Sequence, residues 1–175
     1  MRLIVCFLYF RLPENVSLEE GAMVEALAVV VHACRRVNVH IGQSVLVCGA
    51  GPVGIMTMLC ARAFGASKVF ITDIQQSRLD LAKKLGADDV YYIDIHKPFD
   101  DRKVAAEIVE LMGGRPDLSI ECSGVETSQA MAIHATKSGG RVAIVGLGAP
   151  TNRVPLSSAA MREVDLIGVC RIKDE

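Results

Sequence analysis

The stretch SVLVCGAGPVGIMTMLCARAFGASKVFITD, residues 44–73, decides the fold of this chain. It opens with an apolar run, residues 45–48, that has the length of a buried strand. Gly49, Gly51 and Gly54 follow in the spacing G-x-G-x-x-G, and an apolar helical segment comes next. In such a β-α-β unit the first glycine permits the tight turn, the second lets a pyrophosphate approach the backbone, and the third lets helix and strand pack closely. The stretch therefore predicts a dinucleotide site.

The second apolar run of this stretch, residues 69–71, is followed by Asp73, which lies 19 residues after Gly54. A carboxylate at this point accepts hydrogen bonds from a ribose diol and repels a 2′-phosphate, so NAD is favoured over NADP. Arg78 lies five residues further on. It could pack over the adenine or meet a 2′-phosphate, and the presence of Asp73 favours the first. A tight strand-to-helix turn without a ligand is the weaker alternative.

Composition limits the class of protein. The 175 residues fit one domain, and 19 basic against 20 acidic residues indicate no nucleic-acid partner. No apolar run reaches the length of a membrane span, and the run at 3–10 is short and lacks the cleavage site of a signal peptide. The six cysteines form no C-x-x-C pair. We therefore expect a cytoplasmic protein with buried free thiols and no membrane partner.

Short apolar segments alternate with helical ones along the rest of the chain. The capping box S-x-x-E at residues 17–20 predicts the start of a first helix that ends at Arg35-Arg36. Further helices are expected at 75–85, 100–112 and 125–136, a looser segment at 151–161, and strands at 89–93, 116–121, 141–145 and 164–169.

This alternation predicts an α/β fold, a doubly wound parallel six-stranded Rossmann sheet with strand order 3-2-1-4-5-6. The expected organisation is an irregular segment at 1–16, a linking helical segment at 17–43 and a nucleotide-binding domain at 44–175. The glycine-rich turns at 123–124 and 146–148 follow the fourth and fifth strands. We expect them to let the nicotinamide half of the cofactor approach the backbone, the alternative being ordinary turn glycines.

Six segments occur in an order that resembles the zinc-dependent medium-chain dehydrogenases. They are GAMVEALAVVVHACRR, VLVCGAGPVGIMTM, ECSG, SGGRVAIVGLG, VPL and REVDLIGVCR. The resemblance covers residues 12–171, nearly the whole chain. It implies that NAD is held by the glycine turn and by residues near the ends of the strands. The implied cofactor-binding residues are Gly49, Gly51, Val53, Gly54, Asp73, Arg78, Val145, Gly146, Leu147, Val169, Cys170 and Arg171.

The resemblance also assigns two catalytic residues. On the sequence alone Glu25 is best interpreted as a solvated carboxylate on a helix, whereas the family pattern implies a metal-site residue that binds zinc directly or through water. Arg171 matches an arginine that helps to hold a hydroxyl of a polyol substrate. No segment of these 175 residues resembles the family's domain with the other zinc ligands, and none of the four histidines has metal-ligand spacing. We therefore expect the NAD-binding portion of a polyol dehydrogenase that retains no zinc and is inactive alone.

Two other functions stay open at this point. A truncated, non-catalytic paralogue could bind NAD or pair with a full-length subunit. Its sixth strand would lie at the sheet edge, where an unpaired apolar strand invites association into a homo-oligomer. An S-adenosylmethionine enzyme on a similar fold is a more remote alternative.

Overall fold

The computed structural model describes residues 11–170 and forms one parallel sheet of six strands. The strand order is β3-β2-β1-β4-β5-β6, so the predicted fold and order are confirmed. The predictions for residues 1–10 and for Arg171 lie outside the described residues. The strands are β1 (Ser44–Cys48), β2 (Lys68–Asp73), β3 (Asp89–Tyr92), β4 (Leu118–Glu121), β5 (Arg141–Ile144) and β6 (Asp165–Gly168).

The register of the central strands brings three carboxyl ends together. Cys48, the last residue of β1, pairs with Thr72 of β2 on one side and with Glu121 of β4 on the other. The chain leaves β1 toward β2 and returns to the other side of β1 with β4, so strand order reverses between β1 and β4. Such a reversal opens a crevice beyond the strand ends, where ligands of doubly wound folds bind.

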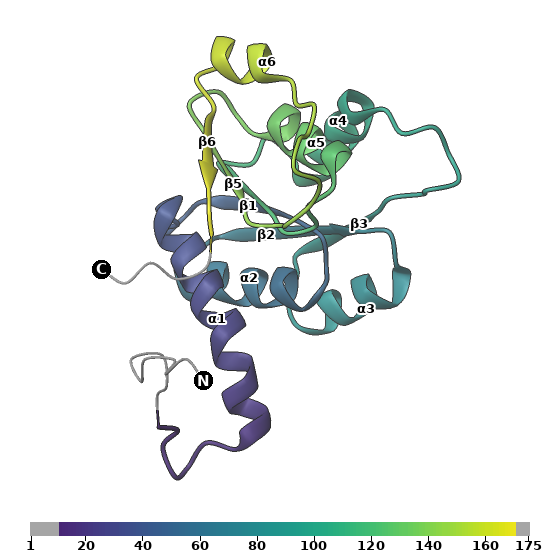
Figure 1. Ribbon diagram of the computed structural model, residues 1–175. Coiled ribbons are helices and arrows are strands. Elements are labelled where there is room, and N and C mark those ends of the chain that lie inside the picture. Colours follow the sequence, from purple (N-terminus) through teal and green to yellow (C-terminus); the bar gives the residue numbers. More distant parts are fainter. Residues whose placement is uncertain (1–10, 171–175) are drawn as a thin grey trace.

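The helices cover the sheet in two layers (Figure 1). Leu46 packs into one hydrophobic cluster and Val47 into the other, because successive strand residues point to opposite faces. Leu46 faces the layer of α4, α5 and α6, and Val47 faces the layer of α1, α2 and α3. The helices are α1 (Leu18–Arg36), α2 (Pro52–Ala63), α3 (Gln76–Lys84), α4 (Asp101–Met112), α5 (Glu126–Ala135) and α6 (Leu156–Met161).

Helix α1 is half core and half solvent-exposed. It begins with the predicted capping box, in which the side chains of Ser17 and Glu20 bond to each other's backbone N–H groups at 3.2 and 2.8 Å. Its C-terminal half buries Val30 and Cys34 against the sheet. The N-terminal half extends away from the body of the molecule (Figure 1) and leaves apolar side chains such as Met23 exposed.

Some predicted bounds were wrong by one or a few residues. Residues 151–161 were expected to be loose, but α6 forms at Leu156–Met161. Pro155 stands at its N-cap, where the missing backbone N–H of proline costs the helix no hydrogen bond. β4 begins two residues later than expected, since Pro116 has no N–H to donate to a neighbouring strand. No helix within residues 11–170 is both long enough and apolar enough to cross a membrane.

Candidate dinucleotide-binding site

The turn between β1 and α2 is shaped by its three glycines. Gly49 has a φ of +99°, a left-handed conformation that glycine adopts without strain. A Cβ on Gly54 would lie 1.8 Å from the carbonyl oxygen of Gly49, so only glycine lets α2 start this close to β1. A Cβ on Gly51 would have no heavy atom within 4 Å. The turn is therefore tightly packed at Gly54, whereas the space next to Gly51, at the N-terminus of α2, is open.

The Asp73 carboxylate is fixed beside this turn. Its Oδ2 accepts the Ala50 N–H at 2.7 Å, and its Oδ1 accepts the Gln75 N–H at 2.8 Å. Arg78 Nη1 lies 3.8 Å from the same Oδ2, and the Asp73 side chain is only 6% exposed. Since a carboxylate oxygen accepts along two lone-pair directions, each oxygen keeps capacity for a ligand hydroxyl. The carboxylate therefore forms part of the pocket wall, and its two backbone hydrogen bonds fix its position in the absence of a ligand.

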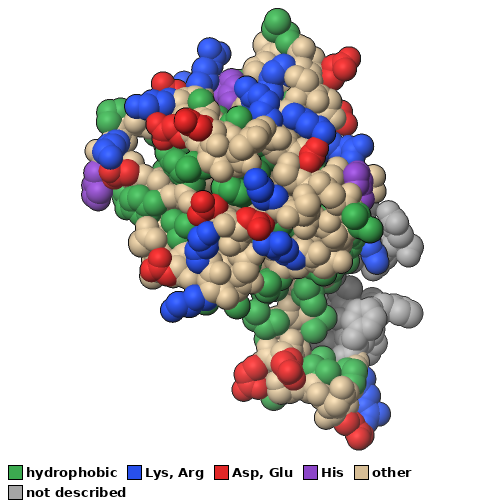
Figure 2. Space-filling view, turned by 180° about the vertical axis from the view of Figure 1, so that it is seen from behind, with side chains coloured by type: hydrophobic (Ala, Val, Ile, Leu, Met, Phe, Trp, Pro, Cys, Tyr) green, Lys and Arg blue, Asp and Glu red, His purple; other side chains and the backbone are tan. Residues whose placement is uncertain are grey.

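A pocket of about 530 Å³ opens in front of these groups. Gly49, Gly51, Asp73 and Arg78 are among its lining residues. Figure 2 shows hydrophobic side chains on this side of the molecule, at the left of the view, flanked by charged ones. A mainly apolar pocket of this size with a few convergent polar groups suits a nucleoside. Its apolar lining is made by Ile74, Ile93, Ile95, Phe99 and Val125.

The segment after β3 supplies much of this apolar lining, and the sequence analysis missed it. It follows Tyr92, whose pairing with Asp73 places the end of β3 beside the end of β2. Within this segment the Asp94 carboxylate and the Lys97 ammonium group form an ion pair of 3.2 Å. The predicted strand order could have indicated this contribution, because it places the end of β3 next to the end of β2, at the same edge of the sheet.

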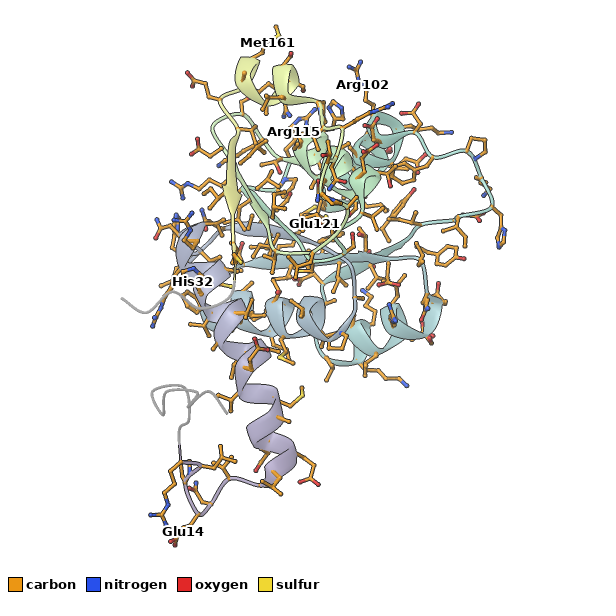
Figure 3. All side chains as sticks on the ribbon, in the orientation of Figure 1. Glu14, His32, Arg102, Arg115, Glu121 and Met161 are labelled. Carbon is orange, nitrogen blue, oxygen red and sulfur yellow. The ribbon has the colours of Figure 1, made fainter. Side chains whose placement is uncertain are left out.

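Glu121 is a second residue that the sequence analysis missed. It is fully buried at the end of β4 (Figure 3). Its carboxyl group accepts the N–H of Ser123 at 2.9 Å, the N–H of Gly124 at 3.1 Å and the hydroxyl of Ser128 at 3.0 Å, together with the Ser123 hydroxyl. The four donors satisfy a carboxyl group that would otherwise be costly to bury. Glu121 thereby fixes the turn at 123–124, which forms one wall of the pocket.

The later glycines have a steric task of their own. A Cβ on Gly146 would lie 2.1 Å from the Gly124 nitrogen, and a Cβ on Gly148 would lie 1.8 Å from the Gly124 oxygen. The turns after β4 and β5 therefore touch backbone to backbone. This contact requires glycine whether or not a nicotinamide lies nearby, a reason that the sequence analysis did not foresee.

The other predicted cofactor residues lie outside the pocket lining. Val53 is the second residue of α2 and packs on the core. Val145 and Val169 are buried at the ends of β5 and β6, Leu147 is 90% exposed, and Cys170 is exposed at the end of the described chain. Their role in binding a cofactor stays a prediction.

The predicted metal-site residue, Glu25, has no cluster of metal ligands around it among the described residues. Glu25 is exposed on the N-terminal half of α1. Within residues 11–170 no group of three His, Cys, Asp or Glu side chains is placed to hold a metal ion. A catalytic zinc needs three protein ligands, so zinc does not fit these residues.

The thiols near the pocket are poor nucleophiles. Burial raises the pKa of Cys122 to about 12, although its bond with Thr57 opposes the shift. Burial and the neighbouring Glu121 raise the pKa of Cys48 well above its ordinary value. Both thiols are therefore protonated at neutral pH, and neither is an activated cysteine nucleophile.

Comparison with known proteins identifies the family. Residues 52–175 match the family described as "Zinc-binding dehydrogenase". The chain belongs to this family. The resemblance inferred from the sequence segments is therefore confirmed.

Known relatives of this zinc-binding dehydrogenase chain include sorbitol dehydrogenases. Those of Bos taurus and Homo sapiens are 49% and 48% identical over 162 residues, which cover 93% of this chain. The same alignment covers 45% and 44% of the two relatives, so the chain spans a little less than half of their length.

Solved structures of the family have the same fold. 2R,3R-butanediol dehydrogenase of Bacillus subtilis superposes with a TM-score of 0.80 at 30% identity, over 94% of this chain and 46% of that one. A Sinorhizobium meliloti protein described as a zinc-binding dehydrogenase, solved bound to NADP, gives a TM-score of 0.81 at 27% identity, over 93% and 47%.

Proposed function

We propose that this chain is the NAD-binding portion of a zinc-dependent polyol dehydrogenase of the sorbitol type. In the complete enzyme the reaction would be oxidation of a secondary alcohol, with NAD as the hydride acceptor. One observation carries the proposal: the buried Asp73 carboxylate is held 2.7 Å from the Ala50 N–H, inside a glycine turn that is open above Gly51. The identity with sorbitol dehydrogenases supports the substrate class.

Each part of the pocket suits one part of the cofactor. The open backbone at Gly51 and the N-terminus of α2, a helix of 12 residues, suit the pyrophosphate. Asp73 suits the ribose diol, and the apolar lining from Ile74 to Phe99 suits the adenine. NAD would supply the hydride acceptor, while these residues bind and orient it.

Calorimetry with NADH and NADPH tests the site and its preference. We expect saturable NADH binding that weakens about tenfold in Asp73→Asn, since the amide offers one acceptor fewer to the ribose diol. NADPH should bind more weakly than NADH to the unaltered chain.

Arg78→Ala decides between the two roles of that arginine. If Arg78 packs by the adenine, as we propose, both cofactors weaken alike by a few fold. A selective loss of NADPH affinity would instead assign Arg78 to a 2′-phosphate. No binding of either cofactor at millimolar concentration would overturn the proposed function.

We also propose that the isolated chain neither retains zinc nor oxidises polyols. Glu25 has no partner ligands among the described residues, and one carboxylate cannot hold tetrahedral zinc. The assay is sorbitol-dependent NADH formation with added zinc. Measurable turnover by the chain alone would contradict this part while leaving NAD binding intact.

We also propose that the chain forms a homo-oligomer through the edge strand β6. The same pairing is expected if the chain is a non-catalytic paralogue. β6 is the last strand of the sheet and pairs only with β5 within the described residues. An edge strand of this kind offers backbone N–H and C=O groups to a second copy. Light scattering should show a dimer, and a monomer at every concentration would refute the pairing.

The five described cysteines are free, which supports a cytoplasmic location.

A further inference from the structure

A second hollow lies on the outer side of the layer of α4, α5 and α6. It has a volume of about 580 Å³ and shares no lining residue with the dinucleotide pocket. Figure 3 places Arg102, Arg115 and Met161 at this end of the molecule, and Figure 2 shows Lys and Arg side chains gathered there. We call it the arginine hollow, and its polar and apolar walls include Arg102, Arg115, His134, Ser157, Met161 and Arg162.

The described residues supply no carboxylate that pairs with the arginines of the arginine hollow. Within residues 11–170, no carboxylate oxygen lies within 4.0 Å of the guanidinium groups of Arg102, Arg115 and Arg162. The Asp101 carboxylate pairs with a different group of the hollow, since its Oδ2 lies 3.8 Å from the His134 imidazole. Three guanidinium groups that have no carboxylate partner in the described part of the chain surround one concavity, and their positive potential favours an anion.

Two of these arginines are already held in place. Arg115 Nη1 donates to the carbonyls of His134 and Ala135, and Arg162 Nη1 donates to the Thr136 carbonyl at 2.6 Å. These bonds cap the C-terminal end of α5, which is a structural role. They leave Nη2 and Nε of Arg115 without a described acceptor. The Arg115 guanidinium group is thus fixed in orientation, and its remaining N–H donors can bind a ligand.

Arg102 has no structural role of this kind. It projects from the first turn of α4 with an exposed side chain, and its guanidinium group donates no hydrogen bond to another residue of the described chain. It therefore differs from Arg62, whose Nη2 bonds to Asp88 at 2.7 Å. Arg102 can therefore bind a ligand without losing a hydrogen bond or ion pair to any residue from 11 to 170.

The pKa directions of two groups agree with this charge imbalance. Burial lowers the pKa of His134, Asp101 opposes the shift, and Arg102, Arg162 and Arg115 lower it further. The pKa of Arg162 is lowered by its own burial and by the charge of Arg115. Like charges thus repel one another in the arginine hollow, and a bound anion would relieve that repulsion.

We propose that the arginine hollow binds the phosphate group of a small phosphomonoester. The planar forks of Arg102 and Arg115 match the oxygens of a phosphate, and the Ser157 hydroxyl lines the same space. Ala105, Ala106 and Met161 add apolar walls, and the volume leaves room for an organic group beyond the phosphate. The site is independent of the proposed NAD site, so either proposal can fail without the other.

The test is a titration of the ¹⁵N-labelled full chain with glucose 6-phosphate, followed by NMR. We expect saturable shifts at the side-chain Nε of Arg102 and Arg115 and at the Ser157 amide, with Gly51 as a marker of the other site. Arg102→Gln should raise the Kd about tenfold, because it removes charge-assisted hydrogen bonds. Lys103→Gln is the matched control, since it removes the same charge one residue away, outside the hollow, and should change the Kd less than twofold.

Three further arms separate the sources of a signal. Inorganic phosphate should produce the same shifts more weakly, and glucose should produce none. The proposal is overturned by unsaturable shifts at millimolar ligand, by equal effects of the two substitutions, or by shifts at Gly51 alone. Stronger binding of hexaglutamate than of glucose 6-phosphate would also overturn it, because it would assign the surface to an acidic peptide.

Discussion

Replacing Gly54 or Gly51 by alanine should separate the folding of the glycine turn from its binding. In Gly54→Ala the new Cβ would meet the Gly49 oxygen at 1.8 Å and the Gly49 carbonyl carbon at 2.8 Å, whereas ordinary contacts begin at 3.4 Å. Backbone must therefore move by roughly 1.5 Å, and neither neighbour is a flexible side-chain end. Overpacking of this kind costs about 3 kcal/mol, at the upper end of the usual range.

Gly51→Ala is the matched control for this perturbation. Its Cβ would have no heavy atom within 4 Å, and its φ of −69° and ψ of −178° suit any residue. The free energy of unfolding should change by less than about 1 kcal/mol, since reduced chain entropy and a poorer N-cap oppose each other. The methyl group would, however, fill the space proposed for the pyrophosphate, so NADH affinity should fall at least tenfold.

Urea unfolding followed by circular dichroism, paired with NADH calorimetry, measures both effects. The expected result is a large stability loss in Gly54→Ala and a nearly pure affinity loss in Gly51→Ala. An unchanged unfolding midpoint for Gly54→Ala would refute the steric reasoning. Unchanged NADH affinity for Gly51→Ala would refute the placement of the pyrophosphate.

Three further predictions follow from the contacts. Glu121→Gln places an amide donor opposite buried N–H donors and should lower the free energy of unfolding by about 1–3 kcal/mol. A thermal melt should show a melting temperature lower by several degrees, and an unchanged melting temperature would contradict the stabilising role of Glu121. Burial raises the pKa of Asp117, but Lys137 and other bonds outweigh it, so the folded-state pKa lies below the unfolded one. Its stabilisation is present above about pH 4 and lost below, and acid titration of Asp117→Asn should lack that loss. Iodoacetamide should label the exposed Cys170 and spare Cys122 until the chain unfolds, as mass spectrometry of the peptides would show.

The fold was predictable because its signals are local. Apolar runs such as residues 45–48 and 69–71 have strand length, and handed crossovers leave few ways to order them. Strand ends were less predictable: β4 was expected to begin at Pro116, but it begins at Leu118, because Pro116 has no N–H for the ladder. The helix at 156–161 was missed because its turn depends on packing of Ala159 rather than on a periodic pattern.

The site was predictable only in its glycine turn and acidic residue. Gly51 and Asp73 lie in one continuous motif, so their spacing alone predicts that they meet. Phe99 and Glu121 come from distant segments, and their contribution depends on tertiary contacts that the sequence does not display. A glutamate at a strand end resembles a surface charge until four donors are seen to converge on it. Glu25 and Arg171 were assigned by resemblance, and their roles remain predictions.

The most direct test of the central claim is an NMR titration of the ¹⁵N-labelled chain with NADH. We predict saturable shifts that are largest at the amides of Gly49, Gly51 and Asp73 and at Ser123 across the pocket. The absence of saturable shifts at millimolar NADH, or shifts confined to the arginine hollow, would contradict it.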